Sequence, residues 1–280
     1  MVKEKAYAKI NLFLNVVAKR FDGFHDLEMV MASLELHDVL EFRKNTTNDI
    51  LITGDTNMTD DYKDNLVYKV ASFMQEEFNV FEGVVINIKK NIPVAAGLAG
   101  GSADAAATLR GLNKLWKLNL SLDDMAKLGL EFGSDIPFCV YNKLCIAKGR
   151  GEELVFLNTK LNIPVLLVNP FIKISTKDVF AQVNPDNIIE KKISNMTNAI
   201  FNKNLDLIIR ELHNSLEEIT FNINPDIRKL KNHIIDTGIK GVLMSGSGST
   251  IFAIEGKKSK LQYSFDTVRD DYYKIITKIR

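Results

Sequence analysis

The chain has 280 residues, a length that suggests two domains or one large domain at about 100–200 residues per domain. Hydrophobic residues make up 46% of the chain and charged residues 25%, which is typical of a globular protein. The 36 Lys and Arg residues against 35 Asp and Glu leave a net charge of +1, which argues against a nucleic-acid-binding or polybasic membrane-binding protein.

The first half of the chain predicts strands followed by helices. Apolar residues alternate along the first strand, which has Lys9 and Asn11 on its polar face. A second extended segment follows, with a turn expected near His37 and Asp38. Ser121 has the spacing of a capping box that opens a helix ending at Gly133. The strands are expected over residues 8–16, 28–42 and 84–88, and the other helices over residues 64–78 and 102–116.

The second half predicts helices and a late sheet. Ser175 resembles another helix cap, and apolar residues at helical spacing run from Leu205 to Ile219. A helix over residues 225–237 has Asn224 as cap and Gly238 as stop. Short strands are expected over residues 163–168, 242–244 and 251–254. The pattern is that of an α+β protein, with a domain boundary between residues 157 and 158.

The cysteines and the apolar segments bear on the compartment. Cys139 and Cys145 form no CxxC pair, so both are expected to be buried free thiols of a reducing compartment. The apolar stretch 10–17 is interrupted by two asparagines and is not expected to be a secretory signal. No apolar run approaches the roughly 20 residues that span a bilayer. We therefore expect a cytoplasmic protein without a membrane partner.

The segment from Pro93 to Ala107 carries the strongest chemical signal. Three glycines and several alanines precede a helix that is rich in alanine. Glycine allows a backbone to approach an anion closely, and a helix N-terminus attracts phosphate. The glycine spacing fits neither a Walker A loop nor a dinucleotide-binding loop. A phosphate cradle is the chemical interpretation, and a tight loop beside a closely packed helix is the structural alternative.

Three further segments carry polar groups in suggestive positions. Lys9 beside Asn11 fits contact with a hydroxyl or phosphate, although a solvated strand face has the same pattern. Phe24 and His25 follow a turn through Gly23 and fit contact with a nucleobase, although a plain turn also explains them. Asp135 precedes Ile136-Pro137, and proline drives the residue before it toward an extended conformation. We therefore expect Asp135 at a corner between a helix and an extended segment, either as a general base or as a solvated helix-end residue.

A late loop, Ser245-Gly246-Ser247-Gly248-Ser249, offers a second set of backbone donors, or else it is a plain turn between two strands. Together with the first strand and the Pro-x-x-x-Gly-Leu-x-Gly-Gly-Ser loop, it resembles the GHMP kinase superfamily of small-molecule kinases. The three motifs occur in the order of that family and span residues 8–254. The segments Asp-Gly-Phe-His and Gly-Ser-Asp-Ile-Pro-Phe resemble the branch whose alcohol substrate carries a cytidine diphosphate in isoprenoid precursor synthesis.

This resemblance implies a two-domain GHMP kinase fold. An N-terminal nucleotide-binding domain with ribosomal-protein-S5-like topology is expected over residues 1–157, and a C-terminal α/β domain over residues 158–280. The active site is expected in the cleft between them. The resemblance also implies ATP as phosphoryl donor, with Mg²⁺ expected but no metal ligand assigned. A small-molecule cytidyl substrate is implied, with no nucleic acid or obligate protein partner.

The resemblance implies a role for particular residues. Lys9 and Asp135 match the catalytic pair that acts on the 2-hydroxyl of the substrate. The residues that match substrate contacts are Asn11, Phe24, His25, Thr176 and Phe180. The residues that match ATP contacts are Asn65, Pro93, Val94, Ala95, Ala96, Gly97, Leu98, Ala99, Gly100, Gly101, Ser102 and Ala103.

Three positions depart from the usual family pattern. Ala99 replaces a glycine and Ala103 a serine, which removes one phosphate or metal contact. Phe24 replaces the more usual tyrosine, which keeps the aromatic ring and loses its hydroxyl. Two alternatives stay open at this point: a superfamily kinase for mevalonate, homoserine or another alcohol, and a non-catalytic relative. Retention of Asp135 argues against the second alternative.

Overall fold

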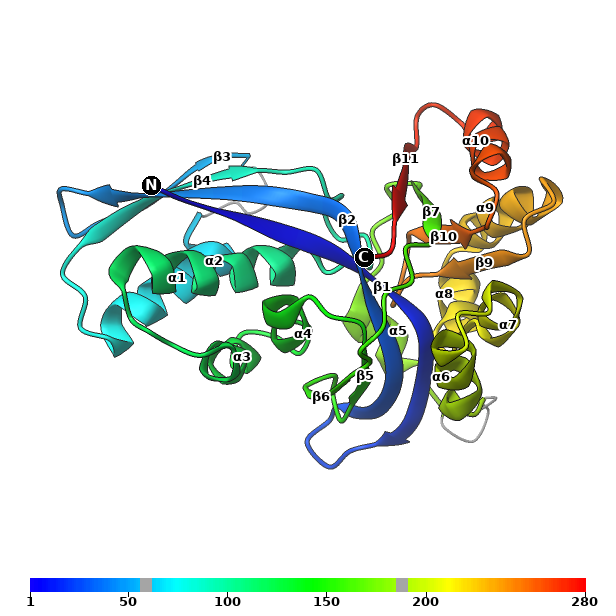
Figure 1. Ribbon diagram of the computed structural model, residues 1–280, viewed down its shortest axis with the longest axis horizontal. Coiled ribbons are helices and arrows are strands. Elements are labelled where there is room, and N and C mark those ends of the chain that lie inside the picture. The colour runs from blue at the N-terminus through cyan, green and yellow to red at the C-terminus, as the bar shows by residue number, and fades with distance from the viewer. Residues whose placement is uncertain (56–61, 185–190) are drawn as a thin grey trace. The chain divides into compact units, whose positions relative to one another are not determined.

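The computed structural model describes residues 1–55, 62–184 and 191–280, which form two compact units (Figure 1). Strands β1 (Val2–Lys19) and β2 (His25–Asn45) contribute one part to each unit. The first unit contains residues 1–8, 36–94 and 99–142, and the second contains residues 9–35, 95–98 and 143–280. The expected division of the chain after residue 157 concerns family domains and stays a prediction.

The first unit is a sheet with helices on one face. Its strand order is β3 (Ile50–Gly54), β4 (Gly83–Lys89), β2 and β1, with β4 antiparallel to β2 and parallel to β3. Helices α1 (Leu66–Glu77) and α2 (Gly100–Trp116) lie along the sheet (Figure 1). Gly111 of α2 packs so closely on β2 that a Cβ atom there would lie 2.3 Å from the Phe42 ring. This close packing fixes α2, the helix that follows the predicted phosphate loop.

Two shorter helices complete the described part of the first unit, together with the single-turn 3₁₀ helix η1 (Tyr62–Asp64). Helix α3 (Leu122–Leu130) begins at the predicted capping box, in which Ser121 and Asp124 each accept a hydrogen bond from the other's backbone N–H. Helix α4 (Ile136–Tyr141) packs against both α2 and α3. The capping box at Ser121 is therefore confirmed.

The second unit contains a four-stranded antiparallel sheet in the order β11 (Tyr273–Lys278), β7 (Pro164–Asn169), β10 (Ile251–Ile254) and β9 (Gly241–Met244). The adjoining part of β1 pairs with the short parallel strand β8 (His213–Asn214), and β2 pairs with β5 (Cys145–Lys148). Strand β6 (Glu153–Phe156) pairs with β5. The helices are α5 (Thr176–Ala181), α6 (Ile193–Phe201), α7 (Leu205–Glu211), α8 (Glu217–Ile223), α9 (Pro225–Asp236) and α10 (Lys258–Thr267).

The core of this second unit lies between helices and the four-stranded sheet. Phe221, Ile227 and Ile234 from α8 and α9 pack with Leu166 and Met244 of the sheet, and all are buried. Asn224 caps α9 by accepting a hydrogen bond from Asp226, as the sequence predicts. Both cysteines are buried and unoxidised, and burial raises the pKa of Cys145 to about 12.

Two predicted features of the chain are wrong. The turn expected at His37 and Asp38 is absent because β2 continues through both residues. Asp38 is fully buried, and its carboxylate accepts hydrogen bonds from backbone N–H groups instead of opening a turn. The helical spacing from Leu205 to Ile219 is interrupted by β8, which pairs with β1. In the described part of the chain, no helix is long and apolar enough to span a membrane.

Candidate active site

Lys9 and Asn11 lie side by side on β1, and neither faces solvent. Lys9 is 5% exposed and Asn11 is fully buried, which excludes the alternative of a solvated strand face. The Lys9 ammonium donates a hydrogen bond to Asn11 Oδ1 at 2.8 Å, and Asn11 Nδ2 donates to Met29 Sδ at 3.3 Å. Placing a cation inside a protein costs folding free energy, so its retention here points to a chemical role.

Residues 95–98 of the predicted phosphate loop are fastened to the late serine-glycine loop, residues 245–250. Ser245 Oγ donates to the Gly97 backbone oxygen at 2.9 Å, and Thr250 N donates to the Ala96 oxygen at 3.3 Å. Gly97 has a φ of +74°, and a Cβ atom there would lie 2.3 Å from the Ser245 oxygen. Only glycine fits this close approach. Two motifs distant in the sequence therefore pack together.

Gly246 marks the point where three segments meet. A Cβ atom at Gly246 would lie 3.6 Å from Lys9 Nζ, 3.7 Å from Asn11 Oδ1 and 3.4 Å from the Gly97 oxygen. Asn214 supports the late loop, because its Nδ2 donates to the oxygens of Met244 at 2.9 Å and Gly246 at 2.8 Å. Sequence reasoning missed Asn214, since it falls within a stretch of helical spacing.

The remainder of the phosphate loop belongs to the first compact unit and leads into α2. Ala99 precedes this helix with a φ of +56°, and Ala95 earlier in the loop has a φ of +52°. The left-handed conformation is unfavourable for alanine and is retained mainly at functional sites. Gly101 is exposed, and among the described residues a Cβ atom there would touch the Leu66 side chain alone, at 3.7 Å. The first turn of α2 is therefore open on the side of Gly101.

Asn65 lies at the start of α1. Its Oδ1 accepts a hydrogen bond from Val67 N at 2.9 Å, so Asn65 caps this helix. The side chain is 6% exposed. The helix cap uses Oδ1 of Asn65, and the side-chain NH₂ group is the part that would make the predicted contact with adenine.

Asp135 lies at a junction between two helices, and the extended corner expected after it is wrong. Its φ of −81° and ψ of −14° are helical, and α4 begins at the next residue with Pro137 in its first turn. Proline is accepted there because the first N–H groups of a helix need no intrahelical partner. Lys9 and Asp135 belong to different compact units, and their pairing stays a prediction.

Arg110 of α2 holds the helix that carries Asp135. Its Nη1 donates to the Cys139 oxygen at 2.8 Å, near the end of α4, and its Nε donates to Glu4 at 3.0 Å. Glu4 is buried, so this ion pair is shielded from solvent. Sequence reasoning missed Arg110 because nothing in its neighbourhood marks the contact.

His25 and Phe180, two predicted substrate residues, lie together. Their ring centroids are 5.2 Å apart at an interplanar angle of 31°. Burial, with a smaller effect from Lys19, lowers the pKa of His25 and favours the neutral imidazole. His25 Nε2 is buried and has no hydrogen-bond partner in the described part of the chain. Such an atom is available to a ligand that brings a complementary group.

Two further predicted substrate residues, Phe24 and Thr176, have different neighbours. Phe24 is 49% exposed, and the Arg150 guanidinium lies 4.7 Å from the centre of its ring. Sequence reasoning missed Arg150. Thr176 begins α5, and its hydroxyl lies 2.8 Å from that of Ser247 in the late loop. The structure therefore joins Thr176 to the loop beside Lys9 and gives Phe24 a cationic neighbour.

Comparison with known proteins places the chain in a family. The model of the GHMP kinases N terminal domain matches residues 65–143, and that of the GHMP kinases C terminal matches residues 196–262. The chain belongs to the GHMP kinase family. The predicted fold class and the predicted small-molecule kinase activity are thereby confirmed, and this family uses ATP as its phosphoryl donor.

Relatives within the family share a more specific name. The 4-diphosphocytidyl-2-C-methyl-D-erythritol kinase of Brevibacillus brevis is 43% identical over 96% of this chain and 92% of its own. The protein of that name from Bacillus subtilis is 42% identical over 96% of this chain and 93% of its own. A crystal structure of 4-(cytidine 5'-diphospho)-2C-methyl-D-erythritol kinase has a TM-score of 0.84 at 28% identity, covering 99% of this chain and 98% of that one. The predicted resemblance to this branch is confirmed.

Proposed function

We propose that this GHMP kinase transfers the γ-phosphoryl group of ATP to the 2-hydroxyl of 4-diphosphocytidyl-2-C-methyl-D-erythritol. The product belongs to the methylerythritol phosphate route to isoprenoid precursors. The observation that carries the proposal is nearly full-length identity of 41–43% to proteins named for this reaction. The convergence of Lys9, Asn11 and Gly246 supplies a site with the required chemistry.

Lys9 and Asp135 are the proposed catalytic residues. Phosphoryl transfer depends mainly on positioning and on stabilising the charge of the transferred group. Asp135 orients the acceptor hydroxyl and takes its proton, and Lys9 polarises the oxygen and stabilises developing negative charge. The hydrogen bond from Lys9 to Asn11 supports this role, because it holds the ammonium at a defined point on β1.

Residues 93–103 are the proposed cradle for the triphosphate of ATP. Gly97 allows the close approach of the two loops, and the open first turn of α2 presents N–H groups to an anion. Asn65 is the proposed contact to adenine. Mg²⁺ is proposed to accompany ATP, with Ser102 as a hydroxyl neighbour. Since Mg²⁺ on a nucleotide takes few protein ligands, the absence of a three-residue metal cluster from the described part of the chain is compatible with it.

The cytidyl group is proposed to bind at His25 and Phe180. The unpartnered His25 Nε2 supports this proposal, because a base edge supplies hydrogen-bonding groups. Phe180 offers an aromatic surface for stacking, and Phe24 is the proposed second aromatic contact. Thr176 and Asn11 are the proposed polar contacts to the rest of the substrate. The cytoplasm is the proposed compartment, where ATP and the cytidyl alcohol are both present. No further protein partner is proposed.

A coupled assay with three alcohols tests the proposal. Each reaction contains ATP, Mg²⁺ and either the cytidyl alcohol, mevalonate or homoserine, and ADP release is followed. We expect turnover with the cytidyl alcohol alone, together with a new phosphomonoester in its mass spectrum. Turnover with mevalonate or homoserine in its place would assign the chain to another branch of the family. ATP binding without turnover on any alcohol would support a non-catalytic relative.

A further inference from the structure

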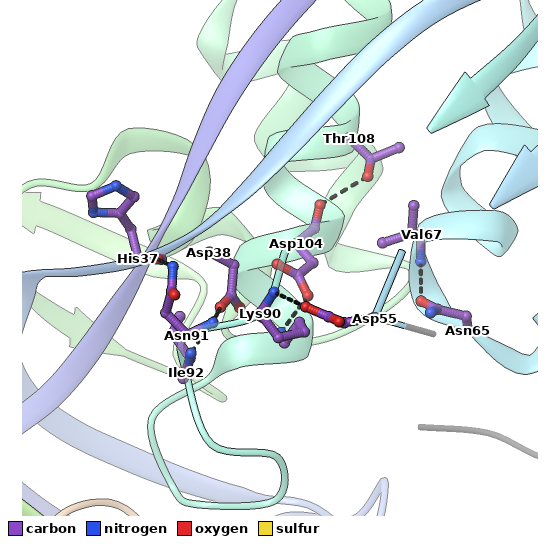
Figure 2. A network of polar contacts seen from close by, with 10 residues as sticks. All are labelled: His37, Asp38, Asp55, Asn65, Val67, Lys90, Asn91, Ile92, Asp104 and Thr108. Atoms are coloured by element: carbon purple, nitrogen blue, oxygen red, sulfur yellow. Dashed lines mark hydrogen bonds and ion pairs between the residues drawn. The ribbon is translucent and has the colours of Figure 1, made fainter. Parts of the chain in front are cut away.

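A buried ionic cluster lies at the base of the phosphate loop, among residues that the proposed chemistry does not use. Figure 2 shows Lys90 between two carboxylates, Asp38 of β2 and Asp104 of α2. The Lys90 ammonium donates to Asp38 and, at 2.6 Å, to Asp104 Oδ2. The two aspartate side chains are 0% and 2% exposed, and that of Lys90 is 12% exposed.

The cluster joins the two ends of the phosphate loop. Lys90 lies three residues before Pro93, and Asp104 lies two residues after Ser102. Asp38 Oδ1 also accepts hydrogen bonds from Asn91 N at 2.5 Å and Ile92 N at 2.8 Å. The backbone that enters the loop is thus fixed to β2, and the helix that leaves the loop is fixed to Lys90.

Fold stability does not explain why a buried carboxylate is present at Asp104. Two carboxylates share one ammonium, and Asp104 Oδ1 is buried with no hydrogen-bond partner in the described part of the chain. Burial is the largest cause that raises the pKa of Asp104 to about 7, opposed by Lys90 and reinforced by Asp38. A buried ion pair with surplus charge seldom stabilises a fold. Stability alone therefore does not explain this carboxylate.

The cluster also touches the start of α2. A Cβ atom at Gly100 would lie 3.6 Å from Lys90 Nζ and 3.1 Å from the Ile92 side chain. Gly100 is the first residue of α2, and Asp104 lies about one helical turn further along. Lys90 therefore packs against the first turn of α2, where the backbone N–H groups face a bound phosphate in the proposed site.

We propose that Lys90 and Asp104 are positioning residues of the ATP site, and that their ion pair holds the ends of the phosphate loop at the spacing a triphosphate requires. This inference rests on the proposed function for the location of ATP. Asp38 fixes the ammonium, and Asp104 acts through the helix without touching the nucleotide. Pre-arranging the N–H groups before ATP arrives lowers the entropy lost on binding.

Substitution of Asp104 tests the inference. Asp104→Ala removes the ion pair with Lys90 and leaves Lys90 paired with Asp38 alone. Alanine also has a higher helix propensity than aspartate, so α2 itself is not weakened. We expect the ATP dissociation constant to rise by about 10-fold, because ATP must then order the loop that the ion pair holds in place in the wild type. KM for the alcohol and the melting temperature should stay near their wild-type values. Asp104→Asn keeps an oxygen that accepts from Lys90, and it should recover most of the affinity.

Glu4→Gln is the matched control. Glu4 is a buried carboxylate that pairs with Arg110 and Lys114, near the other end of the same helix. It should change stability without changing ATP affinity. ATP binding is measured by calorimetry, so the result does not depend on the identity of the alcohol. If the cytidyl alcohol is not a substrate while Asp104→Ala still weakens ATP binding, the inference stands and the proposed substrate fails.

Two results would overturn the inference. One is wild-type ATP affinity in Asp104→Ala, and the other is an equal loss of affinity in Asp104→Ala and Glu4→Gln. If the alanine variant does not fold, Asp104→Ser replaces it, because a serine hydroxyl is also too short to reach Lys90. Unchanged ATP affinity in Asp104→Ser would likewise overturn the inference.

Discussion

The hydroxyl of Ser245 donates a hydrogen bond to the backbone oxygen of Gly97 at 2.9 Å, across 148 residues of sequence. This bond joins the early phosphate loop to the late serine-glycine loop. Gly246 of the late loop in turn lies beside Lys9, so strand β1 meets both loops. Three motifs that lie far apart in the sequence therefore lie together in the fold.

Gly101→Ala separates nucleotide binding from folding. A Cβ atom at this helical position has space in the fold, so the variant should be as stable as the wild type or more stable by about 0.4–1 kcal/mol. In the proposed site the added methyl group reduces the space beside the first turn of α2, so ATP binding should weaken. Calorimetric ATP titration and thermal unfolding of one preparation check both parts. In Gly111→Ala the methyl group meets the Phe42 ring, so stability should fall, in contrast to Gly101→Ala.

Phe180→Ala tests the aromatic contact to the cytidyl group. Stacking of a base on an aromatic ring contributes roughly 1–3 kcal/mol in nucleic-acid complexes. We expect KM for the cytidyl alcohol to rise accordingly, while KM for ATP changes little. Phe201→Ala is the control, because Phe201 is 59% exposed and lies outside the proposed site. Equal changes in both KM values would argue against this contact.

His25→Ala tests whether His25 recognises the hydrogen-bonding edge of the cytosine base. The buried Nε2 has no partner in the described chain, so a base that supplies one should be preferred. The variant should lose part of its preference for the cytidyl alcohol over the uridyl analogue. The measurement is the ratio of kcat/KM values for the two compounds. An undiminished preference in His25→Ala would show that other residues recognise the base. His233→Ala is the control and should keep the wild-type preference.

The raised pKa of Asp104 predicts how stability depends on pH. Burial raises the pKa of Asp104 to about 7 from its ordinary value of 3.8, so Asp104 takes up a proton at a higher pH in the folded protein than in the unfolded chain. Between these values the folded state binds more protons, so this group lowers stability as pH rises. We expect Asp104→Asn to gain stability over the wild type from pH 5 to pH 8. Thermal unfolding across this range checks the sign, and a constant difference would contradict it.

Local signals in the sequence predicted local features well. The Ser121 capping box and the Asn224 cap each depend on neighbours within three residues, and the structure contains both. Asp38 misled the prediction because aspartate favours turns, while its partners here are about 53 residues away. Pro137 misled it because proline fits the first turn of a helix as well as an extended segment.

Long-range contacts account for the residues that sequence reasoning missed. Asn214 donates to the late loop from a two-residue strand that exists only because it pairs with β1. Arg110 reaches carbonyl groups of α4 that no motif marks. The candidate site could be located from its glycine-rich loops and from Lys9, because backbone requirements leave a sequence pattern. The residues that hold these loops leave no such pattern.

Turnover by Asp135→Ala tests the central claim most directly. Loss of a general base slows a reaction by about 10²–10⁴-fold. The account predicts that kcat with ATP and the cytidyl alcohol falls by this factor, while the ATP dissociation constant of the same preparation stays near the wild-type value. Asp226→Ala, at an exposed aspartate of α9, should keep full turnover. Near wild-type kcat in Asp135→Ala would contradict the assignment of Asp135 and the mechanism built on it.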